Sequence, residues 1–348
     1  IKLYGDGEMF EPADYLRILQ EANVAQAITR DRYGAGGAVE ELEKKFCEIT
    51  GKEAAIFLPS GTLANQLALA ILSGEKTKVF VQDSSHIYRD EADAAQSVFG
   101  KRLMPLAKDK TYFTAEQLGK AVENLKDEEV FESGVGAVAI ENPVRRTDGR
   151  MIPIEEIKKI SRWCKDHDIK LHMDGARIYM ASAWSGIPVK EFAVLTDSIY
   201  ISLYKYLGAG AGAILCGSKS MIEKIPHLMK IHGAAMYNNW TNAAMALYRL
   251  KGLEQRLADA KQRSAEIFGI LNNEKDFKVT ALDGGTNIYK LSVLKKVDSK
   301  KMQEILRNNF GVIMQRLDEK NEALITVNET LLYQDAGYVV GAFKAAVK

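Results

Sequence analysis

Two short motifs, each placed after an apolar run, supply a lysine and a carboxylate that could act on one cofactor. Lys205 lies in the segment 202–210 (SLYKYLGAG), and Asp174 lies in 172–177 (HMDGAR). An amine can hold an aldehyde as a Schiff base, and a carboxylate can keep a pyridine nitrogen protonated so that the ring accepts electrons. A lysine between a buried strand and a Gly/Ala run is costly to desolvate unless it is paired or neutralised. The two motifs therefore predict a pyridoxal phosphate site, although most of the 47 lysines and arginines must be solvated surface residues.

The elements before these motifs predict where the two side chains lie. The runs 169–173 and 198–203 are rich in β-branched and aromatic residues, which favours buried strands. In an open α/β sheet, the carboxyl ends of the strands line the ligand crevice. Lys205 and Asp174 are therefore expected at the same edge of a sheet.

A phosphate cradle is predicted at a third strand end. Residues 52–58 are expected to form a strand, Ser60-Gly61-Thr62 a turn, and 63–73 a helix. The glycine lets the backbone approach an anion, and the free amides of the helix start point at it. The alternative is that Ser60 only caps the helix.

Two more strand ends carry groups that could face the cofactor. His86 follows the strand 78–82 and could stack on a pyridine ring and exchange protons with a substrate hydroxyl. Arg145 and Arg146 follow the strand 136–140 and could hold a carboxylate bidentately. The alternatives are a structural histidine and a solvated charged loop.

Together these motifs resemble those of the threonine aldolase and β-eliminating lyase group of fold type I pyridoxal phosphate enzymes, and the chain looks like an L-allo-threonine aldolase. The similarity runs from about residue 33 to residue 245. It rests on segments that match in type and order: 60–66 (SGTLANQ), His86-Ile87, Glu141-Asn142, 172–177 and Lys205 with its Gly/Ala tail.

The resemblance implies a role for each matched residue. Asp174 would pair with the ring nitrogen, and Lys205 would form the internal aldimine. His86 would stack on the ring. The remaining cofactor contacts would come from Ser60, Gly61 and Thr62 at the phosphate and from Arg177, which would bind either the phenolic oxygen or the substrate carboxylate.

The chain departs from the family mainly where substrate is handled. Gly5 stands for a serine near the N-terminus, Val144 for a second histidine, Ala323 for a late arginine and Tyr237 for another arginine. The residues left to bind a substrate carboxylate are Arg145, Arg146, Arg177 and Arg316. Tyr33 precedes a glycine run that is expected to form either an active-site edge or a loop leading into the next helix.

The predicted reaction is cleavage of the Cα–Cβ bond of a β-hydroxy amino acid, such as threonine or allo-threonine, to glycine and an aldehyde. Lys205, Asp174 and His86 would be catalytic. β-Elimination and transamination remain as alternatives, because they differ only in the pose of the substrate. A non-catalytic member of the fold is disfavoured by the intact lysine. A nicotinamide site is also disfavoured, because the Gly/Ala run 208–212 leads into the apolar run 213–216, which predicts a strand where a Rossmann unit needs a helix.

The fold class predicted is α/β, with a large, doubly wound, mainly parallel sheet domain and a smaller C-terminal α+β domain. At 348 residues the chain exceeds one usual core. We expect an N-terminal arm (1–12), a cofactor domain (13–240), and a connector helix with the small domain (241–348). Within the last region, 240–273 is expected to be helical with a bend at 251–252. Short strands are expected at 286–293, 311–315 and 323–327.

Composition limits the partners. The net charge is +1, which argues against nucleic acid or an anionic membrane surface as the main partner. No apolar run approaches the roughly 20 residues that span a bilayer, and no signal peptide is recognised. Three scattered cysteines and five dispersed histidines predict reduced thiols, a cytoplasmic enzyme and no metal site. The resemblance implies a homodimer or a homotetramer acting on a small amino acid.

Overall fold

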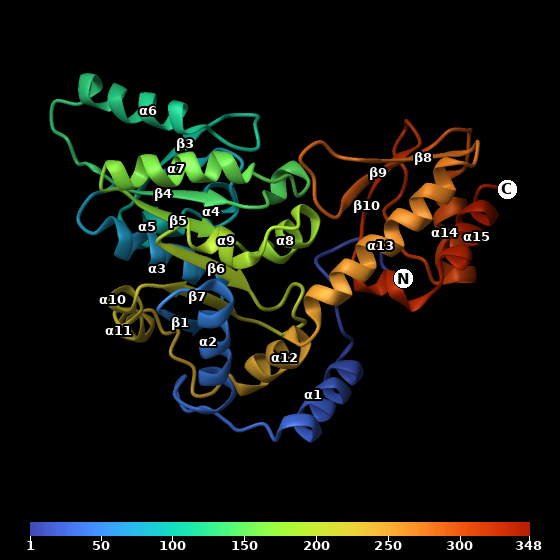
Figure 1. Ribbon diagram of the computed structural model, residues 1–348, viewed down its shortest axis with the longest axis horizontal. Coiled ribbons are helices and arrows are strands. Elements are labelled where there is room, and N and C mark those ends of the chain that lie inside the picture. Colours follow the sequence, from blue (N-terminus) through green and yellow to red (C-terminus); the bar gives the residue numbers. More distant parts are fainter.

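The computed structural model describes residues 1–348, apart from the side chain of Lys126 (Figure 1). Its centre is a seven-stranded sheet with the order β1-β7-β6-β5-β4-β2-β3. The chain alternates strands and helices here, as predicted. The strands are β1 (Ala54–Leu58), β2 (Lys78–Gln82), β3 (Arg102–Leu106), β4 (Val135–Glu141), β5 (Lys170–Asp174), β6 (Ser198–Ser202) and β7 (Ala213–Gly217).

Helices pack on both faces of this sheet, which explains why its strands are continuous apolar runs. Phe57 and Leu58, neighbours on β1, point into different core clusters because side chains alternate along a strand. The helices of this part are α1 (Pro12–Gln26), α2 (Gly37–Thr50), α3 (Gly61–Ser73), α4 (His86–Arg89), α5 (Ala94–Phe99), α6 (Ala115–Glu128), α7 (Ile154–Asp166), α8 (Ile178–Ser185), α9 (Val189–Ala193), α10 (Lys219–Ile222) and α11 (Ile225–Ile231), with a 3₁₀ turn at Arg145–Thr147.

The sheet is mainly parallel, and β7 is the exception. Strands β3, β2, β4, β5 and β6 pair in parallel, whereas β7 is antiparallel to both β6 and β1. The cause is the connection from β6 to β7, residues 203–212, which contains no helix. A parallel neighbour needs a crossover of a dozen or more residues, so this short segment can only return antiparallel. The α/β, doubly wound prediction is confirmed with this one reversed strand.

The small domain has a three-stranded antiparallel sheet with the order β10-β9-β8. Strands β9 (Ile288–Val293) and β10 (Glu322–Thr326) were predicted, but the prediction of a strand at 311–315 is wrong. In that segment Ile313 makes only an isolated bridge with Lys2. The third strand is β8 (Phe277–Ala281), whose alternating burial is the period-two signal of a half-buried strand. The sheet packs on helices α13 (Leu253–Asn272), α14 (Ser299–Phe310) and α15 (Ala336–Ala346).

The connector between the two parts breaks where it was expected to bend. Helix α12 (Trp240–Leu250) ends before Lys251, and α13 starts after Gly252, whose φ of 68° is left-handed. Figure 1 shows α13, in orange, running from the large sheet to the small domain. None of the described helices combines the length and apolarity that a membrane crossing requires. Cys47, Cys164 and Cys216 are unpaired, as predicted.

A buried carboxylate ties this connector to the small domain. Glu329 lies in the 3₁₀ turn Glu329–Tyr333, with a side chain 4% exposed. Its Oε2 accepts from Arg249 Nη2 of α12 at 2.8 Å and from Arg256 Nε of α13 at 2.6 Å. The two helices on either side of the break therefore share one counter-charge.

Replacing Glu329 with glutamine should destabilise the fold, because two largely buried guanidinium groups would lose their only shared carboxylate. Breaking a buried pair costs about 3 kcal/mol or more. Urea unfolding followed by circular dichroism measures this loss. The control is Glu40→Gln, which removes the fully exposed Glu40–Lys44 pair and should leave the unfolding midpoint unchanged. Equal midpoints for the wild type and both variants would contradict the role given to Glu329.

Candidate functional site

Seven of the residues predicted to bind or act on a cofactor line one cavity of about 340 Å³. It lies at the carboxyl ends of β4, β5 and β6, beside the first turn of α3. The clustering follows from topology, because parallel strands deliver their carboxyl ends to the same edge. The residues that the cavity brings together are Ser60, Gly61, Thr62, His86, Asp174, Arg177 and Lys205.

Asp174, the last residue of β5, is buried and held in one orientation. Its Oδ1 accepts from the backbone nitrogen of Ala176 at 3.0 Å. Its Oδ2 accepts from Asn65 Nδ2, on α3, at 2.9 Å. A buried carboxylate is costly unless it is hydrogen-bonded, and these two contacts supply that compensation. The side chain can therefore present a fixed negative charge to a cation in the cavity.

Asn65 is the hub of a buried polar network. It lies in the matched segment 60–66, but no role in the site was predicted for it. Besides Asp174, its Nδ2 donates to Glu91 Oε1 at 2.8 Å, so its Oδ1 must accept from His172 Nε2 at 3.0 Å. His172 Nδ1 then accepts from Ser198 Oγ at 2.8 Å. Burial lowers the pKa of His172 to about 4, so its ring is neutral at physiological pH. This histidine therefore supports the site without titrating in it.

His86 lies at the start of α4 and is fixed from two sides. Its backbone nitrogen donates to Glu141 Oε2 at 2.7 Å, and its Nδ1 lies 2.9 Å from Glu91 Oε1. The hydrogen bond to Glu91 raises the pKa of His86, outweighing the opposing effect of burial. Glu91 orients the ring and leaves Nε2 as the nitrogen available to a ligand.

Three buried carboxylates surround this part of the cavity: Asp174, Glu91 and Glu141. Burial, with the nearby charge of Asp174, raises the pKa of Glu141 to about 7. A cationic ligand group, such as a protonated pyridine nitrogen, would stabilise the ionised forms of these carboxylates. Ligand atoms of His86, Glu91 and Asp174 also lie within 4.8 Å of one another, as in a metal site. Because the Asn65 amide donates to both carboxylates, a metal there would have to displace an N–H group.

The first turn of α3 fits an anion. Ser60 caps the helix, since its Oγ accepts from Leu63 N at 3.3 Å, and the first amides of a helix lack intrahelical partners. Residue 61 must be glycine, because a Cβ there would lie 2.1 Å from the hydroxyl oxygen of the buried Tyr200. Capping by Ser60 and a phosphate cradle are thus compatible interpretations of one turn.

Lys205 completes the fit to pyridoxal phosphate. Its side chain is largely buried, and Nζ donates to Tyr204 Oη at 3.1 Å. The cavity therefore offers an amine, a fixed carboxylate and an anion cradle, which are the three groups that the cofactor requires. Tyr204, the hydrogen-bond acceptor for Lys205, was not predicted as a site residue.

Arg177 lines this cavity with a side chain 12% exposed, but it is already paired. Its Nε and Nη2 each donate to one oxygen of Asp6, both at 2.7 Å. Asp6 lies on the N-terminal segment and was not predicted as a site residue. Arg177 therefore has only its remaining N–H groups to offer a ligand.

The other residues suggested for substrate binding lie elsewhere. Arg145 and Arg146 pair with Asp90 on the surface, and Arg316 donates to Ser299 in the small domain. Tyr33 borders a different cavity. Within one described chain, none of these four lines the cavity that contains Lys205, so their roles in substrate binding stay predictions.

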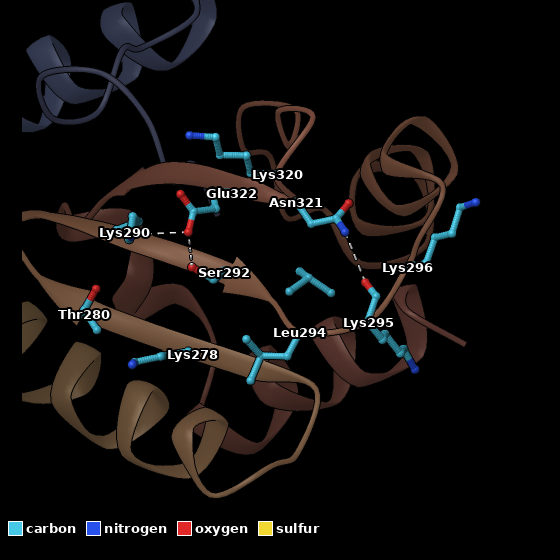
Figure 2. Close-up of a pocket in the computed structure, with 11 residues that line it drawn as sticks. Lys278, Thr280, Lys290, Ser292, Leu294, Lys295, Lys296, Lys320, Asn321 and Glu322 are labelled. Atoms are coloured by element: carbon cyan, nitrogen blue, oxygen red, sulfur yellow. Dashed lines mark hydrogen bonds and ion pairs between the residues drawn. The ribbon is translucent and has the colours of Figure 1, made fainter.

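A further cavity, of about 560 Å³, lies on the solvent face of the small sheet (Figure 2). Five lysines and one glutamate line it, yet Lys278, Lys296 and Lys320 point in different directions in Figure 2, not toward one centre. Lys290 pairs with Glu322, and Lys295 pairs with Asp276. Lysines on edge strands such as β8 discourage pairing with other chains, which accounts for this face without a ligand.

Comparison with known proteins places the chain among lyases. A family model described as beta-eliminating lyase matches residues 17–287. The chain is 33% identical over 280 residues to a low-specificity L-threonine aldolase of Candida albicans, covering 78% of this chain and 72% of the relative. It is 31% identical over 249 residues to the Escherichia coli K12 low specificity L-threonine aldolase, covering 72% and 73%.

Solved structures agree on the fold. A candidate L-allo-threonine aldolase from Listeria monocytogenes superposes with a TM-score of 0.81 at 24% identity, covering 99% of this chain and 95% of that one. A serine palmitoyltransferase from Sphingomonas wittichii gives 0.70 at 16% identity, covering 99% and 86%. At these identities the structures support the fold alone.

The Glu91–His86 contact predicts a measurable titration. Replacing Glu91 with glutamine should lower the pKa of His86, because the hydrogen bond that stabilises the protonated ring is weakened while the burial that opposes protonation remains. The wild-type ring should therefore stay protonated to a higher pH than the variant ring. NMR titration of the imidazole signals measures both values. Glu116→Gln, which removes an exposed carboxylate on α6 paired with Lys120, is the control and should leave the His86 pKa in place. An unchanged or higher pKa in the Glu91 variant would contradict the assignment.

Proposed function

This chain belongs to the threonine aldolase and β-eliminating lyase family of pyridoxal phosphate enzymes, and from that premise we propose that it cleaves the Cα–Cβ bond of a β-hydroxy amino acid. Threonine or allo-threonine would yield glycine and acetaldehyde. The observation that carries the proposal is that Lys205 and Asp174, from different strand ends, line one cavity with an anion cradle.

Each residue of the cavity has a distinct task in the proposed mechanism. Lys205 would hold the cofactor covalently through Nζ, and Asp174 would keep the pyridine nitrogen protonated. Pyridoxal phosphate, when bound, supplies an electron sink for the bond that breaks. Gly61 and Thr62, with the helix start behind them, hold the phosphate.

His86 is the proposed base for the substrate's β-hydroxyl proton, directly or through water. Its Nδ1 is engaged by Glu91, so the proton would be taken at Nε2. The ring must be neutral to accept a proton. Because the pKa of His86 is raised, the neutral ring becomes the main form only at a higher pH than for an ordinary histidine. We therefore expect the rate to rise with pH through this pKa.

β-Elimination and transamination are the competing reactions, and the substrate side of the cavity keeps them open. Gly5, Val144 and Ala323 remove a hydroxyl, an imidazole and a guanidinium that the family uses there. Asp6 occupies the fork of Arg177. The carboxylate of the substrate must therefore be held by the remaining N–H groups of Arg177, on Nη1 and Nη2, or by other donors, and the reacting bond follows from that pose.

Replacing Lys205 with alanine should abolish both the covalent chromophore and lyase turnover with every amino acid, because no other lysine lines the cavity among the described residues. The test is a visible absorption spectrum after adding pyridoxal phosphate, followed by additions of glycine, allo-threonine and serine. Lys108→Ala, an exposed lysine with no assigned contact, is the control and should match the wild type. Near wild-type activity in the Lys205 variant would overturn the assignment.

We also propose that two copies associate through the surface around Tyr33, as a homodimer or within a homotetramer. Tyr33, Ile231, Met236 and Tyr237 are exposed apolar side chains. Of these, Tyr33 and Met236 line a mainly apolar cavity of about 640 Å³. Exposed apolar patches of this kind are typical of interfaces. A cytoplasmic location is a further proposal, supported by the three unpaired cysteines.

Met236→Asp should weaken this association, because it buries a charge without a partner in an apolar interface. Light scattering coupled to gel filtration gives the molar mass of each form. The matched control is Val24→Asp, an equally radical change on the exposed face of α1. A wild-type monomer, or an unchanged oligomer in the Met236 variant, would contradict the proposed interface.

A further inference from the structure

The N-terminal segment reaches across the molecule to the cavity. Near its start, Leu3 is buried in the core of the small domain, where its nitrogen donates to Ile313 O at 2.7 Å and its oxygen accepts from Thr326 N at 3.0 Å. Three residues later, Asp6 pairs with Arg177 in the cofactor domain. The segment is therefore a strap with one end fixed in each part of the protein.

The strap runs directly against the backbone of the proposed cofactor lysine. Gly7 has a φ of 83°, and a Cβ at this residue would lie 3.0 Å from Lys205 O and 3.2 Å from Tyr206 Cα. Both the left-handed backbone and the close approach require glycine. The position of Asp6 is consequently set by packing, not by its side chain alone.

Asp6 is held as a charged partner of Arg177. Burial would raise the pKa of Asp6, but the hydrogen bond and charge of Arg177 bring that pKa below its usual value. Tyr206 Oη adds a third contact, donating to Asp6 Oδ1 at 3.3 Å. A bidentate carboxylate fixes the plane of a guanidinium as well as balancing its charge. Arg177 therefore enters the cavity as part of a neutral, oriented pair.

We propose that Asp6 is a positioning residue for the cofactor. It commits Nε and Nη2 of Arg177, aims the remaining N–H groups at the oxygen substituent of the ring, and prevents the guanidinium from acting as an unbalanced positive charge. The inference rests on the proposed function, because it assumes that pyridoxal phosphate occupies the cavity. Asp6 leaves to a ligand only the N–H groups of Arg177 that it does not engage, on Nη1 and Nη2.

Removing the charge of Asp6 should shift the pH midpoint of the visible band in one direction. Without the carboxylate of Asp6, the positive charge of Arg177 would be balanced by Glu141 alone. Lys205 and Tyr206 would lose the same acidic neighbour. The less balanced charge of Arg177 disfavours protonation of the nitrogen that joins the cofactor to Lys205. The pH at which the visible band changes between its protonated and unprotonated forms should fall. The loss of a fixed guanidinium should also weaken cofactor binding.

The experiment compares wild type, Asp6→Asn and Asp6→Ser by titrating each protein with pyridoxal phosphate and then following the visible band against pH. Both variants should lower the pH midpoint by about one unit and weaken cofactor affinity on the order of tenfold. Two side chains of different shape should give the same shift, because the charge is what both remove. Glu8→Gln, on the same strap and bonded to Tyr333, is the control and should behave as wild type.

The outcomes separate this inference from the proposed function. A wild-type band with the same midpoint and affinity in both Asp6 variants would overturn the positioning role while leaving the cofactor assignment intact. A shift seen in one variant only would also overturn it, since shape and not charge would then be responsible. A wild-type protein that forms no band would overturn both proposals.

Discussion

The hydrogen bond between Asn65 and Asp174 is the constraint on which the site depends. It joins α3 to β5 and sets the direction of a buried carboxylate that must face the cavity. The same amide holds Glu91 and, through its oxygen, selects the tautomer of His172. A buried network of this kind is stable only when every member is satisfied, so helix, strand and site are positioned together.

The buried carboxylates near this network together favour a cationic ligand group more than any one of them does alone. Three buried carboxylates lie near the ends of β4 and β5, and burial, with the nearby charge of Asp174, raises the pKa of Glu141 to about 7. A protonated ring nitrogen in the cavity would relieve the desolvation of Asp174.

The cavity-lining residues that follow the strands were predictable, because the order of the strands in the sheet brings them together. Lys205, Asp174 and His86 come after buried strands, and parallel strands bring such positions together. Glu91 carried no comparable signal, and Asn65, although within the matched segment 60–66, was given no role, since a polar residue within or beside a helix is usually unremarkable. The 311–315 strand prediction was wrong because apolar residues there pack against the small core while the backbone only bridges to Lys2.

The surroundings of Arg177 were not predictable for a physical reason: its partner Asp6 is distant in sequence. Asp6 and Arg177 meet because the strap is anchored in the small domain and crosses to the large one, and no local pattern encodes that path. The same holds for Arg316, which the small domain places away from the cavity and against Ser299. Under the proposed function, the residues that face the cofactor come mainly from one sheet, whereas those around the substrate come from separate segments. Such a site can keep its cofactor while its substrate changes.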